Sequence, residues 1–282
     1  MVEYPTHIIC KDHLVSGEEF HIKETPIKGV LKTYPTPDKN KIGYYYESNS
    51  YISHTDSKDN FIDKIYQFVK NYAIKSKYKT ILKLKPNTKK LLDIGSGTGD
   101  FLSASKNYNI SSTGTEPNEH ARKLSKAKGN NVVKELEELK GDKFDVITLW
   151  HVLEHVYEPS AYLKKIDALL NKDGILLIAV PNYNSSDAKH YKNYWAAYDV
   201  PRHLWHFSKT GMKELLEKQN FKITKYKALP FDSFYVSLLS EENKSGRKNL
   251  VKAFSIGLLS NLKAKSTSEY SSILYIAKKN TK

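Results

Sequence analysis

"LLDIGSGTGDFL", residues 91–102, is the stretch that decides the fold of this chain. A short apolar run ends in Asp93 and leads into Gly95, Gly97 and Gly99 before an apolar pattern resumes. Glycine has no Cβ, so a backbone rich in it can turn tightly and approach a ligand closely. The spacing is G-x-G-x-G, which differs from the G-x-G-x-x-G of dinucleotide sites and lacks the G-K-[ST] of a P-loop. The stretch therefore predicts a strand, a ligand-binding turn and a helix.

An acid follows the next predicted strand. Glu116 ends residues 110–116 and lies 21 residues after Gly95 (116 − 95). An acid at this point can accept hydrogen bonds from both hydroxyls of a ribose. Asp93 would repel a pyrophosphate, but it can accept a hydrogen bond from an ammonium group or hold the loop. The alternative is a tight turn followed by a surface glutamate.

Strands and helices alternate through the rest of the chain, which predicts an α/β fold with a mainly parallel sheet and helices on both faces. A helix begins near Ser57, where apolar residues recur every three or four positions. The predicted strands are 90–94, 110–116, 131–136, 143–150, 174–180, 221–229 and 271–279, and the other predicted helices are 99–107, 117–128, 158–170 and 209–218. In such folds ligands bind at the carboxyl ends of the strands.

The domain organisation follows from this pattern. Residues 1–56 are rich in Pro, Gly, Ser and Tyr, and we expect them to form an irregular arm, with short strands at most, that covers the active site. Residues 57–282 form the main domain, with insertions at about 182–208 and 231–270.

Three stretches together resemble the class I S-adenosylmethionine-dependent methyltransferases: "LLDIGSGTGDFL", "GTEPN" (114–118) and "FDVITLWHVLEHV" (144–156). "YYYESNSYISHTDS" (44–57) and "DVPRHLWHFS" (199–208) resemble a bacterial subgroup that acts on small molecules. The resemblance implies a Rossmann-like, seven-stranded sheet. It also implies S-adenosylmethionine as the cofactor and S-adenosylhomocysteine as the product.

The resemblance also implies where the cofactor binds. The Gly95–Gly99 loop would surround its methionine end, with Asp93 beside it, and Glu116, followed by Pro117, would bind the ribose. Trp150, after the fourth strand, would contact the cofactor. The third strand carries no clear pair of residues for the adenine.

Tyrosines in residues 44–54 are a further candidate cover for the cofactor. A tyrosine ring can pack against an adenine or a sulfonium while it offers a hydroxyl group. We expect this role for Tyr46 and Tyr51, and core packing is the alternative.

His151, Glu154 and His155 spell H-x-x-E-H, a spacing found in one class of zinc peptidases. On a long helix the two histidines would share a face and hold a metal ion. Here the motif follows a predicted strand and reaches Pro159 quickly, so a strand end and a turn fit better. We therefore expect no metal at the site. Glu154 and His155 are expected to brace the turn, and His151 to shape the pocket or act as a base.

The loop 193–211 is the candidate acceptor wall, since it gathers aromatic residues and histidines after the fifth strand. Histidine titrates near neutral pH, so His203 or His206 could take a proton from the acceptor, and we favour one of them over His151 as the base. Arg202 could bind an acidic group on the acceptor. The alternative is an aromatic cluster that covers the core.

Charge and composition bound the remaining possibilities. The chain has 282 residues, 45 Lys+Arg against 31 Asp+Glu and a formal charge of +14, but the Lys residues are scattered. Cys10 is the single cysteine, which excludes an internal disulfide and a Cys-rich zinc site. No signal peptide and no run long enough to span a membrane is found, so we expect a cytoplasmic protein. Residues 247–265 predict a basic amphipathic helix that closes the pocket, forms a homodimer or touches a membrane surface.

The sequence favours a methyltransferase for a small-molecule or carrier-linked acceptor, with oxygen as the preferred acceptor atom and no nucleic-acid partner. An RNA methyltransferase is the first alternative, based on the positive charge. A non-catalytic cofactor-binding subunit is the second.

Overall fold

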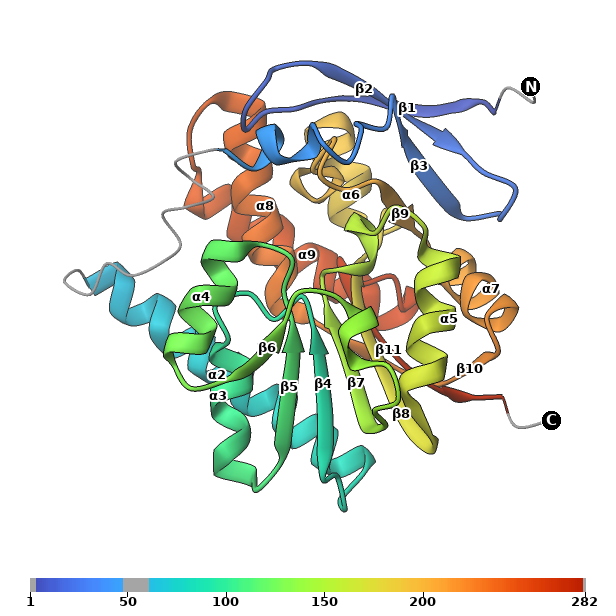
Figure 1. The fold of residues 1–282 in the computed structure, drawn as a ribbon. Helices are drawn as coiled ribbons and strands as arrows, with labels where there is room; N and C mark the ends of the chain where they lie inside the picture. The colour runs from blue at the N-terminus through green and yellow to red at the C-terminus, as the bar shows by residue number, and fades with distance from the viewer. Residues whose placement is uncertain (1–3, 48–60, 281–282) are drawn as a thin grey trace. The chain divides into compact units, whose positions relative to one another are not determined.

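The computed structural model describes residues 4–47 and 61–280 (Figure 1). The chain forms two compact units. Unit 1 contains residues 1–52, 151–160 and 179–275, and unit 2 contains residues 53–150, 161–178 and 276–282.

Seven strands form the main sheet, in the order β10–β11–β8–β7–β4–β5–β6. They are β4 (Lys90–Ile94), β5 (Ser111–Thr115), β6 (Asn131–Val133), β7 (Phe144–Trp150), β8 (Leu170–Pro181), β10 (Phe221–Ala228) and β11 (Ser272–Lys279). The pairs β4–β5, β4–β7 and β5–β6 are parallel. The predicted seven-stranded, mainly parallel sheet is confirmed.

Within unit 2, β6, β5, β4 and β7 lie side by side (Figure 1). Leu91, Leu92 and Ile94 of β4 are buried, as is every residue from Val146 to Leu149 in β7. Continuous burial, rather than alternation, is typical of parallel strands covered on both faces. The register places Asp93 opposite Gly114 on one side and Thr148 on the other.

The helices between residues 61 and 169 follow the predicted pattern. They are α2 (Phe61–Leu84), α3 (Asp100–Ala104), α4 (Glu119–Ala127) and α5 (Pro159–Leu169). Asn118 begins α4, because its side chain accepts a hydrogen bond from the Ala121 N–H and satisfies one of the free donors at the helix start.

Unit 1 contains a second sheet that the sequence did not predict. Its strand order is β1–β2–β3–β9, and the strands are β1 (Thr6–Lys11), β2 (Glu19–Glu24), β3 (Val30–Tyr34) and β9 (Trp205–Phe207). β1 to β3 are antiparallel neighbours, and β3 pairs with β9 (Figure 1). The described part of the arm is therefore largely regular, because a strand about 170 residues later in the chain completes its sheet.

The helices of unit 1 are α6 (Ser186–Tyr191), α7 (Lys209–Lys218), α8 (Pro230–Ser245) and α9 (Leu250–Thr267). α8 and α9 pack closely: a Cβ at Gly257 would lie only 2.8 Å from the Phe234 ring. The amphipathic helix predicted at 247–265 is α9, and its apolar side is exposed at Leu250, Val251, Phe254, Leu258, Leu259 and Leu262. Within residues 4–47 and 61–280, none of the helices has the length and hydropathy needed to cross a bilayer.

Asp187 connects four segments of unit 1. Its buried carboxylate accepts hydrogen bonds from the Trp195 indole N–H at 2.8 Å and from the hydroxyls of Ser260 and Ser271 at 2.6 Å each. These donors come from the loop after α6, from α9 and from the residue before β11. The burial of this charge is thus compensated by three donors.

Candidate functional site

The glycine loop of unit 2 joins β4 to α3. Gly95, Gly97 and Gly99 all have left-handed backbone angles, with φ of 68°, 54° and 81°. A Cβ at Gly99 would lie 2.0 Å from the Ser125 hydroxyl, so Gly99 is required for packing against α4. A Cβ at Gly97 would meet nothing within 4 Å. The space beside Gly97 is therefore open for a ligand.

Glu116 holds this loop from the end of β5. The side chain is buried, with 8% exposure, and one carboxylate oxygen accepts the Gly97 N–H at 2.8 Å. The other oxygen accepts the Asn118 N–H at 2.9 Å. Each oxygen keeps a second lone pair, so Glu116 can still accept hydroxyl groups from a ligand. Arg122 donates to the carbonyls of Glu116 and Pro117, which fixes the turn into α4.

Asp93 is fully enclosed at the end of β4 and accepts a hydrogen bond from the Thr148 hydroxyl at 2.6 Å. Burial raises the pKa of Asp93 to about 7. The Thr148 hydrogen bond and the charge of Lys77 act in the opposite direction, and the charge of Glu116 adds to the rise. A cationic ligand group beside this carboxyl would favour its charged form.

Among the buried polar groups of unit 2, one in the glycine loop and one at the end of β7 have no hydrogen-bond partner in the described residues. They are the hydroxyl of Ser96, inside the glycine loop, and the indole N–H of Trp150, at the end of β7. The Trp150 ring packs edge-on to Phe101, and the Lys77 ammonium lies 4.2 Å from its centre. Open space at Gly97, free lone pairs on Glu116 and these two groups fit an adenosyl cofactor with a charged methionine end.

The H-x-x-E-H stretch is not a helix. His151 has a left-handed φ of 57° and donates its backbone N–H to Ala179. Only a short 3-10 turn, η4 (Leu153–His155), follows. Because the two histidines do not share a helical face, the arrangement of a zinc-peptidase helix is absent from this stretch. The predicted strand end and turn are confirmed.

His151 is paired with two carboxylates. Its Nε2 lies 3.1 Å from Asp232, and its Nδ1 lies 3.5 Å from Glu154. Burial alone lowers the pKa of His151, but the contact with Asp232 and the negative charges of Asp232 and Glu154 raise that pKa to about 10. His151 is therefore protonated at neutral pH, and a protonated imidazole cannot take a proton from an acceptor.

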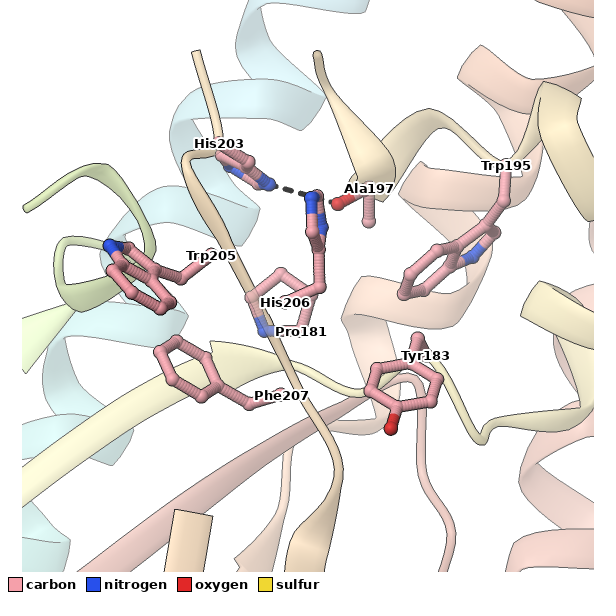
Figure 2. A pocket seen from close by; sticks show the side chains of 8 residues that line it. All are labelled: Pro181, Tyr183, Trp195, Ala197, His203, Trp205, His206 and Phe207. Atoms are coloured by element: carbon pink, nitrogen blue, oxygen red, sulfur yellow. Dashed lines mark hydrogen bonds between the residues drawn. The ribbon is translucent and has the colours of Figure 1, made fainter. Parts of the chain in front are cut away.

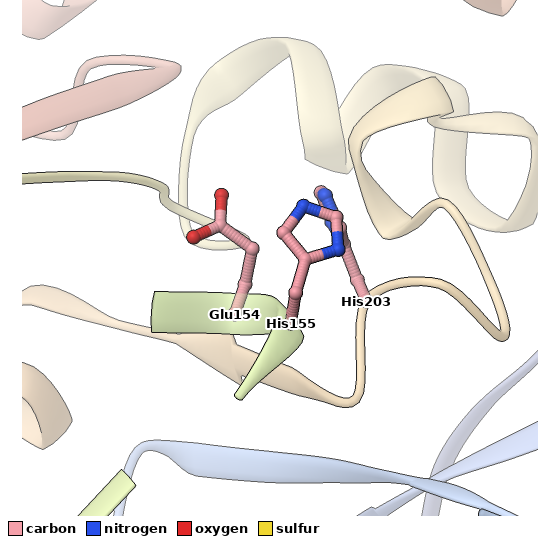
Figure 3. Close-up of side chains that lie close together, drawn as sticks. All are labelled: Glu154, His155 and His203. Carbon is pink, nitrogen blue, oxygen red and sulfur yellow. The ribbon is translucent and has the colours of Figure 1, made fainter. Parts of the chain in front are cut away.

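Glu154, His155 and His203 gather in unit 1, and Figure 3 shows their side chains extending alongside one another. One potential ligand atom from each lies within 4.8 Å of the other two. The Leu204 N–H donates to the Glu154 carbonyl at 2.8 Å, which holds the loop carrying His203 against η4.

His203 and His206 line a narrow crevice with six other residues of unit 1 (Figure 2). The lining residues are Pro181, Tyr183, Trp195, Ala197, His203, Trp205, His206 and Phe207. The crevice leaves no room for a water molecule, so an acceptor can enter only if side chains move. The loop 193–211 thus forms both the predicted aromatic cluster and one wall of the crevice.

The two histidines of the crevice differ in their hydrogen bonds. The ring Nδ1 of His203 lies 2.9 Å from the Ala197 carbonyl and must donate to it, which leaves the lone pair on Nε2. His206 is held at Nε2, 2.9 Å from the Thr33 hydroxyl. That hydroxyl donates to the His203 carbonyl, so it accepts from His206. Burial and the charge of His203 keep the pKa of His206 well below its usual range.

Arg202 has a structural role. Its guanidinium is 1% exposed and contacts Asp12 at 2.9 Å and Asp199 at 2.7 Å. It also donates to the Tyr45 carbonyl. These partners use its donors, so Arg202 is a brace between the arm and the loop rather than a free anion binder.

Tyr46, expected near the cofactor, has its hydroxyl 3.1 Å from Nδ1 of His155 in unit 1. Tyr51 lies outside the described residues. Sequence reasoning missed Thr33, Asp232 and Asp12 as partners of the histidine and arginine groups. They lie far from those groups in the sequence, and no spacing in the chain marks them.

A family model described as "Methyltransferase domain" matches residues 63–226, which is more than half of the chain. Among curated proteins, the ubiquinone biosynthesis O-methyltransferase of Actinobacillus pleuropneumoniae serotype 5b (strain L20) is 34% identical over 108 residues, covering 33% of this chain. The corresponding protein of Haemophilus ducreyi is 32% identical over the same length. The matched segment spans 46% of each relative, about half its length.

Solved structures show the same fold at low identity. A SAM-dependent methyltransferase from Archaeoglobus fulgidus superposes with a TM-score of 0.51 at 22% identity, over 74% of this chain and 94% of that one. The magnesium protoporphyrin IX methyltransferase of Synechocystis PCC 6803 with bound SAH gives 0.55 at 15% identity, over 85% and 99%.

Proposed function

The chain belongs to this methyltransferase-domain family, and we propose that it transfers a methyl group from S-adenosylmethionine to an oxygen atom of a small-molecule acceptor. The observation that carries the proposal is the pairing of Gly97 with Glu116. The backbone beside Gly97 is open, and the carboxylate that orients it keeps lone pairs for a ribose.

The residues of unit 2 have separate parts in holding the cofactor. When bound, S-adenosylmethionine supplies an electrophilic methyl group on a sulfonium. Glu116 would accept the ribose hydroxyls, and Asp93 would face the cationic end. The Ser96 hydroxyl and the Trp150 indole N–H, which have no hydrogen-bond partner among the described residues, would donate to the cofactor.

Oxygen is proposed as the acceptor atom because the matched relatives are named as O-methyltransferases. A hydroxyl acceptor must lose its proton during transfer, and a positioned base assists that step. Of the three candidate histidines, His203 has its Nε2 lone pair available, whereas His206 donates from Nε2 and His151 is protonated. We assign the base to His203 and a supporting role to His206.

The arm is proposed to complete the acceptor side. Thr33 of β3 contacts both His203 and His206, and Tyr46 contacts His155. Through these contacts the arm fixes the orientation of the imidazoles within unit 1.

The proposal has a two-part test with purified protein. S-adenosylhomocysteine should raise the melting temperature, since a ligand that binds only the native state stabilises it. Labelled methyl groups should then appear on phenols or catechols, beginning with hydroxylated precursors of ubiquinone. Binding without turnover on any acceptor would favour the non-catalytic subunit. Transfer to RNA alone would favour the RNA enzyme.

A further inference from the structure

Glu154 is a buried charge of unit 1 whose two oxygens both lack a hydrogen bond within the described part of the chain. Its side chain is 1% exposed. The nearest cation, Nδ1 of His151, lies 3.5 Å away, beyond the usual range of an N–H···O bond. Leaving a buried carboxylate without hydrogen bonds is costly, and metal coordination is one of the ways in which proteins compensate it.

The two neighbouring histidines are oriented as metal ligands usually are. Nδ1 of His155 lies 3.0 Å from the Arg202 carbonyl, and Nδ1 of His203 lies 2.9 Å from the Ala197 carbonyl. A carbonyl only accepts, so each Nδ1 carries the proton and each Nε2 carries the lone pair. A hydrogen bond from the second ring nitrogen to a backbone carbonyl fixes the tautomer of a metal-binding histidine in this way.

We propose that Glu154, His155 and His203 form a binding site for a divalent transition-metal ion such as Zn²⁺. Two imidazole nitrogens and one carboxylate are a donor set that such ions prefer, and three protein ligands leave a coordination position open. The sequence led us to expect no metal. The H-x-x-E-H spacing points to His151 and His155 on a helix, whereas this site pairs His155 with a residue 48 positions later (203 − 155).

The geometry requires only a small closure. The three ligand atoms lie within 4.8 Å of one another, and zinc bonds of ~2.0–2.2 Å bring tetrahedral ligand atoms to within roughly 3.5 Å. Side-chain rotations that move the ligand atoms by about 1 Å bridge this difference. The charged groups around the site are Asp199, with an oxygen 4.0 Å from Nε2 of His203, and His151, which faces Glu154.

A metal ion and the proton of an acceptor would both bind the lone pair on Nε2 of His203. His203 therefore cannot act as a metal ligand and as the base at the same time. Metal binding itself does not depend on methyl transfer, so the two proposals can fail separately. The metal proposal is therefore tested by measuring metal binding. The role of His203 as a base is tested by measuring turnover in chelator-treated protein.

The test is a titration of the chelator-treated full chain with Zn²⁺, followed by calorimetry and elemental analysis. One equivalent should bind per chain and raise the melting temperature. Glu154→Gln, which preserves volume, and His155→Ala and His203→Ala should each weaken binding by at least about 100-fold, the upper end of what losing even an outer-shell partner costs. His190→Ala removes an exposed histidine and should leave binding unchanged.

Wild-type protein offers a second measurement in case a variant does not fold. Co²⁺ bound by the three residues should show the visible absorption of a low-coordinate ion. If Co²⁺ keeps the spectrum of the aqueous ion, or if Zn²⁺ binds equally to all folded variants, the proposal is overturned.

Discussion

Two buried glutamates, Glu116 of unit 2 and Glu154 of unit 1, have opposite surroundings. Each oxygen of Glu116 accepts a backbone N–H from a residue close to it in the chain or one strand away. Neither oxygen of Glu154 accepts a hydrogen bond from the described residues, and its neighbours are histidines. Glu116 is positioned before any ligand arrives. Glu154 depends on the charge of nearby histidines, His151 in its own segment and His203 in the loop before β9.

The contrast extends to how each group of residues is assembled. The glycine loop and Glu116 lie within residues 91–118, where β4, the loop, α3 and β5 follow one another in the chain. The histidine group draws on β3, η4, the loop before β9 and β9 itself, so its members are up to 173 residues apart. The residues proposed to bind the methyl donor are thus close together in the sequence. The residues proposed to act on the acceptor come together only when unit 1 is folded.

The largest effect is expected at the glycine loop. Gly97→Val should abolish measurable S-adenosylhomocysteine binding, a loss of at least about 100-fold or roughly 2.7 kcal/mol, because the side chain fills the open space. Calorimetry measures the affinity. Gly141→Val is the matched control: Gly141 also has positive φ and nothing within 4 Å, so it carries similar strain away from the loop. Equal loss in both variants would show that strain, rather than ligand space, is responsible.

The next effect belongs to the histidine group. In chelator-treated protein, His203→Ala should lower the turnover rate by roughly 10²–10⁴-fold while leaving cofactor affinity nearly unchanged, because it removes a base and no donor contact. His206→Gln, which can still donate to Thr33, should retain most of the turnover. If only His151→Ala loses activity, the base is His151. If all three variants remain active, catalysis relies on proximity and orientation.

A smaller change is expected from Glu116→Ala. Hydrogen bonds to charged groups contribute roughly 1.5–3 kcal/mol each, so the loss of a ribose contact should reduce cofactor affinity at least about tenfold. Glu119→Ala, an exposed glutamate at the start of α4, is the control and should have little effect. Unchanged affinity in the Glu116 variant would mean that this carboxylate only braces the loop.

The smallest effect concerns Asp93 and pH. Its folded-state pKa of about 7 lies above the unfolded value of 3.8, so its contribution to stability is complete below pH 3.8 and is lost as the pH rises through 7. Between pH 6 and pH 8 the free energy of unfolding should fall by about 1 kcal/mol through this group. Denaturant titrations of wild type and Asp93→Asn measure it. The same pH slope in both proteins would assign the dependence to other groups.

Much of unit 2 could be predicted from the sequence because its signals are local. The apolar run before the glycines predicted β4 with the observed bounds, and residues 143–150 predicted β7 to within one residue. The arm could not be predicted in the same way. β3 is paired with β9, and a strand whose partner lies about 170 residues away leaves little trace in its own stretch of sequence.

The candidate sites divide along the same line. Gly97 and Glu116 were identified from spacing, and the structure joins them by a hydrogen bond. The pairing of Tyr46 with His155, the commitment of Arg202 to Asp12 and Asp199, and the high pKa of His151 all arise from tertiary neighbours. Residue types alone made these side chains candidates, but only their partners distinguish a brace from a base.

The Asp187 junction bears on how this chain can be shortened or recombined. A deletion that removed α9 and the segment before β11 would take away the Ser260 and Ser271 hydroxyls and leave a buried carboxylate with the Trp195 indole as the remaining donor of the three. The region 231–270, which the sequence predicted as an insertion, supplies Ser260 to this junction, so it cannot be exchanged independently of Asp187. Chimeras that swap it between relatives need to carry a matching residue at position 187, or replace the acid and its two serines together.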